Sequence, residues 1–240
     1  MNVFMEAVAR PLYLQVREAL LARMADGEWK AGTALPSEFA LAAELGVSQG
    51  TVRKALDALA AENLVLRRQG RGTFVPEHTE ERALFHFFRM QDADGRAVLP
   101  QPLSQQIELV MPSKAVAKAL DAGRRKLWRV ARVRTVNGRP AIVEHIYLDP
   151  KRFPALDAQT ALPNALYSFY QTTAGISIAR ADDRLSAVPA PADVAAELGV
   201  APGAPLLFAE RLAYDLRDEV AELRLSWFDT GAQSYLVSLW

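Results

Sequence analysis

The sequence predicts an α+β protein of two domains, with a helical N-terminal domain and a larger second domain around a largely antiparallel sheet. Three observations predict it. The 240 residues are long for one compact core and sufficient for two small ones. Apolar residues recur at helical spacing up to about residue 61, and the chain is richer in strand-like segments from about residue 84. The polar stretch PEHTEE at 76–81 lacks periodicity, so we expect the first domain at 1–76, a linker at 77–83 and the second domain at 84–240.

Composition excludes several classes of protein. The chain has 28 basic and 28 acidic residues, so its net charge favours no partner by sign. A nucleic-acid-binding site must therefore come from local clustering of charge. The absence of cysteine excludes disulfides and thiolate metal sites, and it fits a cytoplasmic location. No apolar run reaches the roughly 18–20 residues of a membrane span, and the N-terminus lacks the pattern of a secretion signal.

Three helices are expected in the first domain. The first follows Pro11, which suits an opening helical turn, and ends near Gly27. The second begins at Ser37 as N-cap and ends at Gly46, and the third is capped by Ser48 and runs to about residue 61. The apolar positions of the first two helices are Leu12, Val16, Leu20, Met24, Phe39, Leu41, Ala42 and Leu45.

A β-hairpin is expected after the third helix. Short strands at 64–66 and 73–75 flank the glycine-containing turn RRQGRG, residues 67–72. Residues 49–75 hold five basic residues, namely Arg53, Lys54, Arg67, Arg68 and Arg71, against the acidic Asp57 and Glu62. This segment therefore has a local charge of +3 in a chain whose total is zero.

The third helix has two distinct faces. Its core-facing stripe is expected from Val52, Ala55, Leu56 and Leu59. Small, polar and basic residues occupy the other side, and the helix N-terminus itself suits a phosphate. Three helices followed by a basic hairpin, called a wing, can place one helix in the DNA major groove. The alternative is an ordinary surface helix beside a solvated hairpin.

The second domain is expected to alternate strands and helices. Strands are predicted at 107–111, 127–136, 141–148, 176–188, 205–215 and 220–229, with a hairpin turn at Asn137-Gly138. Helices are predicted at 113–120, 164–173 and 191–198. On three strands, charged side chains share a face with apolar ones, which is typical of an apolar pocket with a few converging polar groups. The alternatives are ordinary solvent faces, or a purely structural pairing of Glu144 with an arginine.

The first domain closely resembles the GntR family of bacterial transcription regulators. The resemblance rests on PLYLQVREAL, LPSE, LAAELGVSQGTVRKALDALAAENLV and RRQGRGTFV, which cover residues 11–75 almost continuously. The second domain resembles the UTRA effector domain of the HutC subfamily, which has the chorismate lyase fold. That match is looser and rests on VRTVNGRPAIVEHIYLD, ALYSFY, AELGV and VAELRLSWF. The resemblance implies a homodimer that binds a palindromic operator through its winged helix–turn–helix domains and is released, as a repressor, by a small metabolite. An activator of the same family is the alternative.

The resemblance also assigns DNA contacts to particular positions. We assign DNA binding to Ser37, Ser48, Gln49, Gly50, Thr51, Arg53, Lys54, Arg68, Gly70, Arg71, Gly72 and Thr73. Two positions depart from the usual family pattern, because Phe39 follows LPSE and Gln49 follows the capping serine, where arginine is common at both. Since arginine suits guanine and glutamine suits adenine, we expect a changed base preference opposite Gln49.

Effector contacts are implied in the second domain. The candidate residues are Arg132, Arg134, Glu144, Tyr167, Ser168, Glu222 and Arg224. In sugar-phosphate-sensing members, arginines and a hydroxyl near these positions hold the anionic group, which suggests a phosphate or carboxylate effector.

No cofactor or metal is expected. The three histidines, His78, His86 and His145, form no short ligand motif. An enzyme with the lyase-like fold is the second hypothesis, and an attached DNA-binding domain argues against it. A third hypothesis, a GntR branch with an all-helical, metal-binding sensor, conflicts with the strand-rich pattern.

Overall fold

The chain forms two compact units, Met1–Glu77 and His78–Trp240. The computed structural model describes residues 10–79, 90–92, 94–158 and 162–237. Each unit is described by itself below.

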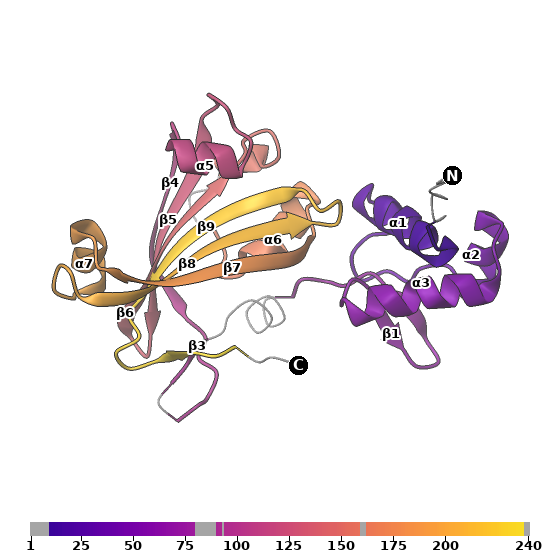
Figure 1. Cartoon of the computed structure of the whole chain (residues 1–240), viewed down its shortest axis with the longest axis horizontal. Helices are drawn as coiled ribbons and strands as arrows, with labels where there is room; N and C mark the ends of the chain where they lie inside the picture. The colour runs from indigo at the N-terminus through magenta and orange to yellow at the C-terminus, as the bar shows by residue number, and fades with distance from the viewer. Residues whose placement is uncertain (1–9, 80–89, 93, 159–161, 238–240) are drawn as a thin grey trace, which may run out of the picture. The chain divides into compact units, whose positions relative to one another are not determined.

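The described part of the first unit contains three helices and a hairpin. These are α1 (Leu12–Ala25), α2 (Glu38–Leu45), α3 (Gln49–Ala61), β1 (Leu66–Arg68) and β2 (Gly72–Phe74). The indigo-to-purple part of Figure 1 shows them. The Oγ atoms of Ser37 and Ser48 accept hydrogen bonds from Ala40 N and Thr51 N, each at 3.1 Å, and so cap α2 and α3. The predicted starts of both helices are confirmed.

The core of this unit comes from the predicted faces, with one error. Val52, Ala55, Leu56 and Leu59 on α3 are all buried, as expected. Phe39 was expected on the apolar side of α2 but is 75% exposed. It lies two positions, about 200° of helical rotation, before the fully buried Leu41, and so projects away from the core.

The hairpin starts later than predicted. The first strand, expected at 64–66, begins at Leu66, because the end of α3 occupies the preceding residues. Asn63 has φ of 60°, and Leu64 N donates to Leu59 O at 2.9 Å, which closes the helix with a left-handed turn. Gly70 and Gly72 also have positive φ, 69° and 106°, which explains glycine at both positions of the turn.

The second unit is built on a six-stranded antiparallel sheet with the order β4-β5-β6-β9-β8-β7. The strands are β4 (Gln101–Val110), β5 (Leu127–Val136), β6 (Arg139–Leu148), β7 (Ile178–Pro189), β8 (Pro205–Asp215) and β9 (Val220–Phe228). The turn between β5 and β6 has positive φ at Asn137 and Gly138, as the Asn-Gly pair predicted. A short pair, β3 (Met90–Gln91) with β10 (Ser234–Tyr235), lies outside this sheet.

Helices cover both faces of this sheet. They are α5 (Lys114–Ala119), α6 (Leu166–Ala174), α7 (Ala192–Leu198) and a 3-10 turn at Pro154–Ala158. Val130 on β5 packs in one core with α6, whereas Val133 packs in another with α7. Because odd and even residues of a strand face opposite ways, α6 and α7 cover opposite faces. The predicted α+β class is confirmed.

Candidate DNA-binding surface and effector pocket

The N-terminal half of α3 presents an exposed polar face. Gln49, Gly50, Arg53 and Lys54 are exposed on the side opposite the buried stripe, as predicted. Thr51 is partly exposed, and its Oγ1 lies 2.8 Å from Ser48 Oγ. The face is therefore a polar surface of small residues that ends in two basic side chains.

A carboxylate on α2 organises this face, and it was not predicted. Glu38 accepts hydrogen bonds from Arg53 Nε at 2.9 Å, Arg67 Nη1 at 3.1 Å and Gln49 Nε2 at 3.5 Å. Burial raises the pKa of Glu38, but the bonds from Arg53 and Arg67 outweigh it, and the pKa lies below its usual value. Glu38 therefore ties the front of α3 to β1. Its place in the LPSE stretch was the available signal.

No contact within the first unit requires glycine at position 50. A Cβ built at this position would contact only Ser48 Oγ, at 3.8 Å. Glycine within a helix is about 1 kcal/mol less favourable than alanine. Neither packing nor backbone geometry requires this glycine. An exposed glycine at the front of a helix is typical of a site where a binding partner approaches the protein backbone closely.

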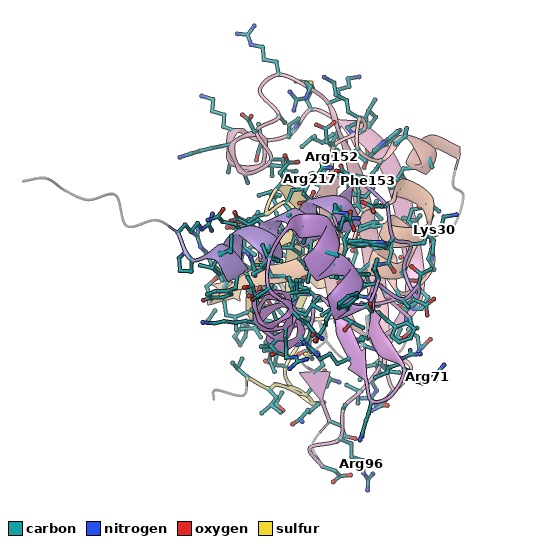
Figure 2. The ribbon with its side chains drawn as sticks, turned by 90° about the vertical axis from the view of Figure 1, so that its right-hand side faces the viewer. Lys30, Arg71, Arg96, Arg152, Phe153 and Arg217 are labelled. Carbon is teal, nitrogen blue, oxygen red and sulfur yellow. The ribbon has the colours of Figure 1, made fainter. Side chains whose placement is uncertain are left out.

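Some of the remaining predicted DNA contacts are exposed, and others are buried or form hydrogen bonds within the first unit. Gly70, Arg71 and Gly72 are exposed in the hairpin turn, from which Arg71 extends in Figure 2. Thr73 is only 8% exposed, so its side chain lies inside the domain, and its backbone O accepts from Leu35 N at 2.8 Å. The Ser37 hydroxyl serves as the α2 cap.

Two of the basic side chains lie over aromatic rings. Lys54 Nζ lies 4.2 Å from the centre of the Tyr13 ring, and the Arg68 guanidinium lies 4.7 Å from that of Phe74. Both side chains are exposed, so they remain at the surface while packing on the domain.

The second unit buries a cluster of charged and polar side chains on the sheet face covered by α6. It comes from alternate positions of three neighbouring strands and consists of Arg132, Arg134, Glu144, Glu222, Arg224 and Ser226. Arg132 lies opposite Glu144, which lies opposite Ser226, so these three form one row across β5, β6 and β9. The candidate residues that the sequence placed on separate strands are thus brought together.

Two of the three arginines are matched by carboxylates. Arg224 donates from Nε and Nη2 to Glu222 at 2.9 and 3.0 Å, and from Nη1 to Glu144 at 3.3 Å. Arg134 Nη1 lies 3.7 Å from Glu144, and its Nη2 donates to Asn164 Oδ1 at 2.8 Å. Burial raises the pKa of Glu144, but Arg224, Arg134 and Arg132 outweigh it and lower the pKa to about 2.

The third arginine, Arg132, has no carboxylate partner among the described residues. Its side chain is 1% exposed, and its Nη2 reaches only Asn164 O and Oδ1, both at 3.5 Å. Its Nε and Nη1 have no hydrogen-bond partner within the described ranges. Burial is the main cause that lowers the pKa of Arg132. With three arginines and two glutamates, this cluster has an excess positive charge that an anion would neutralise.

Helix α6 adds hydroxyl groups to the cluster. Tyr167 Oη donates to Glu222 Oε1 at 3.3 Å, and Tyr170 Oη donates to Glu222 Oε2 at 2.6 Å. Burial and the Glu222 charge raise the pKa of both tyrosines. Ser168, between them in sequence, is partly exposed, and its O accepts from Thr172 Oγ1 at 3.0 Å.

Sequence reasoning missed two members of this site. Tyr170 was not among the candidate effector contacts, but it is fully buried and its hydroxyl belongs to the cluster. Asn164 was placed inside a helix, whereas α6 begins at Leu166, and Asn164 Nδ2 also donates to Pro100 O at 3.0 Å. No periodic pattern marks a residue before a helix, so the signal for Asn164 was absent.

The buried charge of Glu144 predicts a pH dependence of stability. Its pKa is lowered from 4.5 to about 2, so its stabilising contribution is present above about pH 4.5 and is lost as pH falls through about 2. We expect the difference in unfolding free energy between wild type and Glu144→Gln to shrink by about 3 kcal/mol from pH 5 to pH 2. Urea unfolding of both proteins across this range measures it, and a constant difference would contradict it.

Neither a cluster of metal ligands nor a membrane-spanning helix occurs among the described residues. They contain no group of three or more potential metal ligands, and His86 lies outside them. Within the same residues, no helix has the length and apolar character needed to cross a bilayer.

Two family models match the chain. The model of bacterial regulatory proteins of the gntR family matches residues 12–75, and the UTRA domain model matches residues 104–232. The chain belongs to the GntR family. A GntR regulator with a UTRA domain binds DNA and responds to a small-molecule effector, as the sequence predicted.

Relatives and solved structures agree with this assignment. The HTH-type transcriptional repressor NagR of Bacillus subtilis is 30% identical over 206 residues, 85% of this chain and 84% of the relative. MngR of Escherichia coli, the repressor of a mannosyl-D-glycerate transport/metabolism system, is 28% identical over 92% of each chain. The crystal structure of PhnF from Mycobacterium smegmatis has the same fold, with a TM-score of 0.52 at 24% identity, over 92% of this chain and 98% of its own.

The two competing hypotheses lose their support here. The relatives are named transcription regulators rather than enzymes. The UTRA match and the antiparallel sheet contradict an all-helical sensor in this GntR regulator.

Proposed function

We propose that this GntR regulator is a cytoplasmic repressor that binds a palindromic operator as a homodimer and leaves it when an anionic metabolite binds the UTRA domain. Residues 1–76 bind DNA, 77–83 are the linker and 84–240 bind the effector. The observation that carries the proposal is Arg132, a buried cation without a carboxylate partner among the described residues. Such a group is costly in the free protein and is stabilised by a bound anion.

The DNA-binding part of the proposal rests on the front of α3 and on the wing. Gln49, Gly50 and Arg53 would face the major groove, while Arg71 and its glycine neighbours would contact phosphates. Their exposure and the local positive charge support this role.

The effector part rests on the charge balance of the cluster. Arg132 and Arg134 would bind a phosphate or carboxylate, while Glu144 and Glu222 would accept from hydroxyl or amino groups. Mannosyl-D-glycerate, the compound in MngR's name, combines a carboxylate with hydroxyls and illustrates this chemistry.

The homodimer has a candidate surface at one edge of the sheet. The two edge strands are β4 and β7. β7 carries four charged residues along Ile178–Pro189, which discourage pairing with another strand. β4 carries one, Glu108, and exposes Leu103 and Leu109. A second copy paired at β4 would cover these leucines.

Release requires a route from the pocket to the linker, and α6 offers one. Tyr167 bonds Glu222 through its hydroxyl, and its ring meets the His78 ring edge-on, with centres 6.5 Å apart. His78 N also donates to Gln171 Oε1 at 2.8 Å. An effector that shifts α6 would therefore shift the start of the linker and favour dimers whose winged domains are wrongly spaced for two half-sites.

Operator binding and ligand stabilisation test the proposal together. The full-length protein is first used to select DNA from a randomised pool, and then heated with a panel of sugar phosphates and sugar acids. A ligand at 100 times its Kd stabilises the native state by about 2.7 kcal/mol. We expect a compound that raises Tm also to release the selected DNA. A stabilising compound that leaves the DNA bound would contradict the proposal.

The selected half-site is expected to differ from the common family sequence. Gln49 replaces the usual arginine, so adenine should replace guanine at the base that it faces. The Gln49→Arg variant should return the preference to guanine, by about 1–3 kcal/mol per base pair. Parallel selections with both proteins measure the change, and an identical half-site from the two would overturn it.

The wing is expected to act through phosphate. We expect Arg71→Ala to weaken binding to all sequences alike and to reduce the slope of log K against log salt by about 1. Titrations between low and moderate salt measure this slope for operator and random DNA. The matched control is Arg96→Ala, since Arg96 is also exposed but belongs to the second unit. A loss confined to the operator would contradict the phosphate role.

A further inference from the structure

Several buried polar atoms of the UTRA domain gather on one side of the charged cluster. Among the described residues, those without a hydrogen-bond partner include Gln105 Oε1, Arg132 Nε and Nη1, and Glu144 Oε2. Native proteins leave few such atoms, and each costs about 1–3 kcal/mol. A concentration of them in one place therefore indicates a site that a ligand completes.

The register of the sheet places these atoms together. Gln105 on β4 lies opposite Arg132 on β5, and Arg132 lies opposite Glu144 on β6. Residues directly opposite each other in antiparallel strands project to the same face, with Cβ atoms about 5 Å apart. The unpartnered atoms thus extend from the arginines to the edge strand.

The chemistry of these unpartnered atoms specifies which ligand groups could form hydrogen bonds with them. Arg132 offers N–H donors, which require acceptor oxygens. Glu144 is ionised at neutral pH and Gln105 offers a carbonyl oxygen, so both require O–H or N–H donors. A simple alkyl phosphate or carboxylate would satisfy Arg132 and leave the two acceptors unpaired.

We propose that Gln105 extends the effector pocket onto β4, and that the effector is a hydroxylated organic anion whose hydroxyl or amino groups bond Gln105 and Glu144. This inference rests on the proposed function, because it assigns the ligand class of the same pocket. Gln105 is then a specificity residue that separates polyol anions from alkyl anions of equal charge.

Matched probes test the ligand class directly. D-glucose 6-phosphate is compared with n-hexyl phosphate, and D-gluconate with hexanoate, by calorimetry on the full-length protein. In each pair the charge and the number of carbons are the same, and the hydroxyls differ. We expect at least one polyol anion to bind about tenfold or more tightly than its alkyl partner. Equal binding within both pairs, or no binding at about 10 mM, where sites with Kd near 1 mM are filled, would overturn the inference.

Variants of β4 test the residue. Gln105→Met keeps the length of the side chain and removes the amide, and Gln106→Met is the control on the neighbouring, exposed position of the opposite face. We expect Gln105→Met to weaken the polyol anion about tenfold and to leave alkyl-anion and operator binding unchanged, and Gln106→Met to change nothing. Equal weakening of both probes would mean that Gln105 only positions Arg132, and would overturn the role.

A third variant separates this inference from the proposed function. If Arg132→Leu loses the anion while Gln105→Met keeps wild-type affinity for every probe, the pocket stands and the extension onto β4 is wrong. If Arg132→Leu binds every probe as wild type does, the proposed effector pocket itself is wrong.

Discussion

Arg132→Leu is expected to abolish effector-induced release while leaving operator binding intact. Two unpartnered donors of the buried guanidinium would bind the anionic group of the effector. Hydrogen bonds to charged groups contribute about 1.5–3 kcal/mol each, so the concentration needed for release should rise by about 100-fold or more. The DNA-binding unit does not contain this residue, and operator affinity should therefore remain unchanged.

The same substitution should not destabilise the ligand-free protein. Arg132 is a buried cation without a carboxylate partner in the described part of the chain, so an apolar side chain of similar reach removes a desolvation cost. We expect the Tm of Arg132→Leu to equal or exceed that of wild type. Glu144→Gln is the matched comparison. It leaves Arg134 and Arg224 with fewer counter-charges, so it should lower Tm while also preventing release.

Fluorescence anisotropy of labelled operator DNA, titrated with an effector, measures both variants. The control is Glu108→Gln. This substitution removes a carboxylate that forms an ion pair with Arg129 outside the cluster. Normal release by both Arg132→Leu and Glu144→Gln at the wild-type effector concentration would show that the pocket assignment is wrong.

Gly50→Glu is expected to abolish operator binding without unfolding the protein. A side chain at this position meets only Ser48 Oγ, so the helix can accommodate it and gains the better propensity of a non-glycine residue. On the DNA-facing front of α3, the same side chain would both block close approach and repel phosphates. We expect operator affinity to fall by about 100-fold or more, towards the level of non-specific binding.

Two alanine variants provide controls, because their expected effects on stability have opposite signs. Gly50→Ala should raise stability by about 1 kcal/mol and weaken the operator complex only moderately. Gly46→Ala should lower stability, because Gly46 ends α2 with φ of 65°, and should leave the affinity of the folded fraction unchanged. Thermal unfolding and operator titration of the three variants test these expectations. If Gly50→Glu bound the operator as wild type does, α3 would not be the recognition helix.

The sequence predicted more of the first unit than of the second. Helix starts at Ser37 and Ser48 and the stop at Gly46 follow from local hydrogen bonding and backbone preference, and the structure confirms them. The prediction that Phe39 lies on the apolar side of α2 was wrong, because a short helix has too few positions to define its buried side from spacing alone. Glu38 could not be assigned, since its three partners lie on α3 and β1, up to 29 residues away.

Motifs and local periodicity were sufficient to predict the family, the α+β class, the two-unit organisation and the strands that carry charged residues. Which charges are neutralised depends on contacts that form only in the folded chain. Strand register brings Arg132, Glu144 and Gln105 into one row, and α6 adds Tyr170 from far along the chain. The balance that leaves Arg132 without a carboxylate is a sum over long-range neighbours in a low-dielectric interior, and no local pattern encodes it.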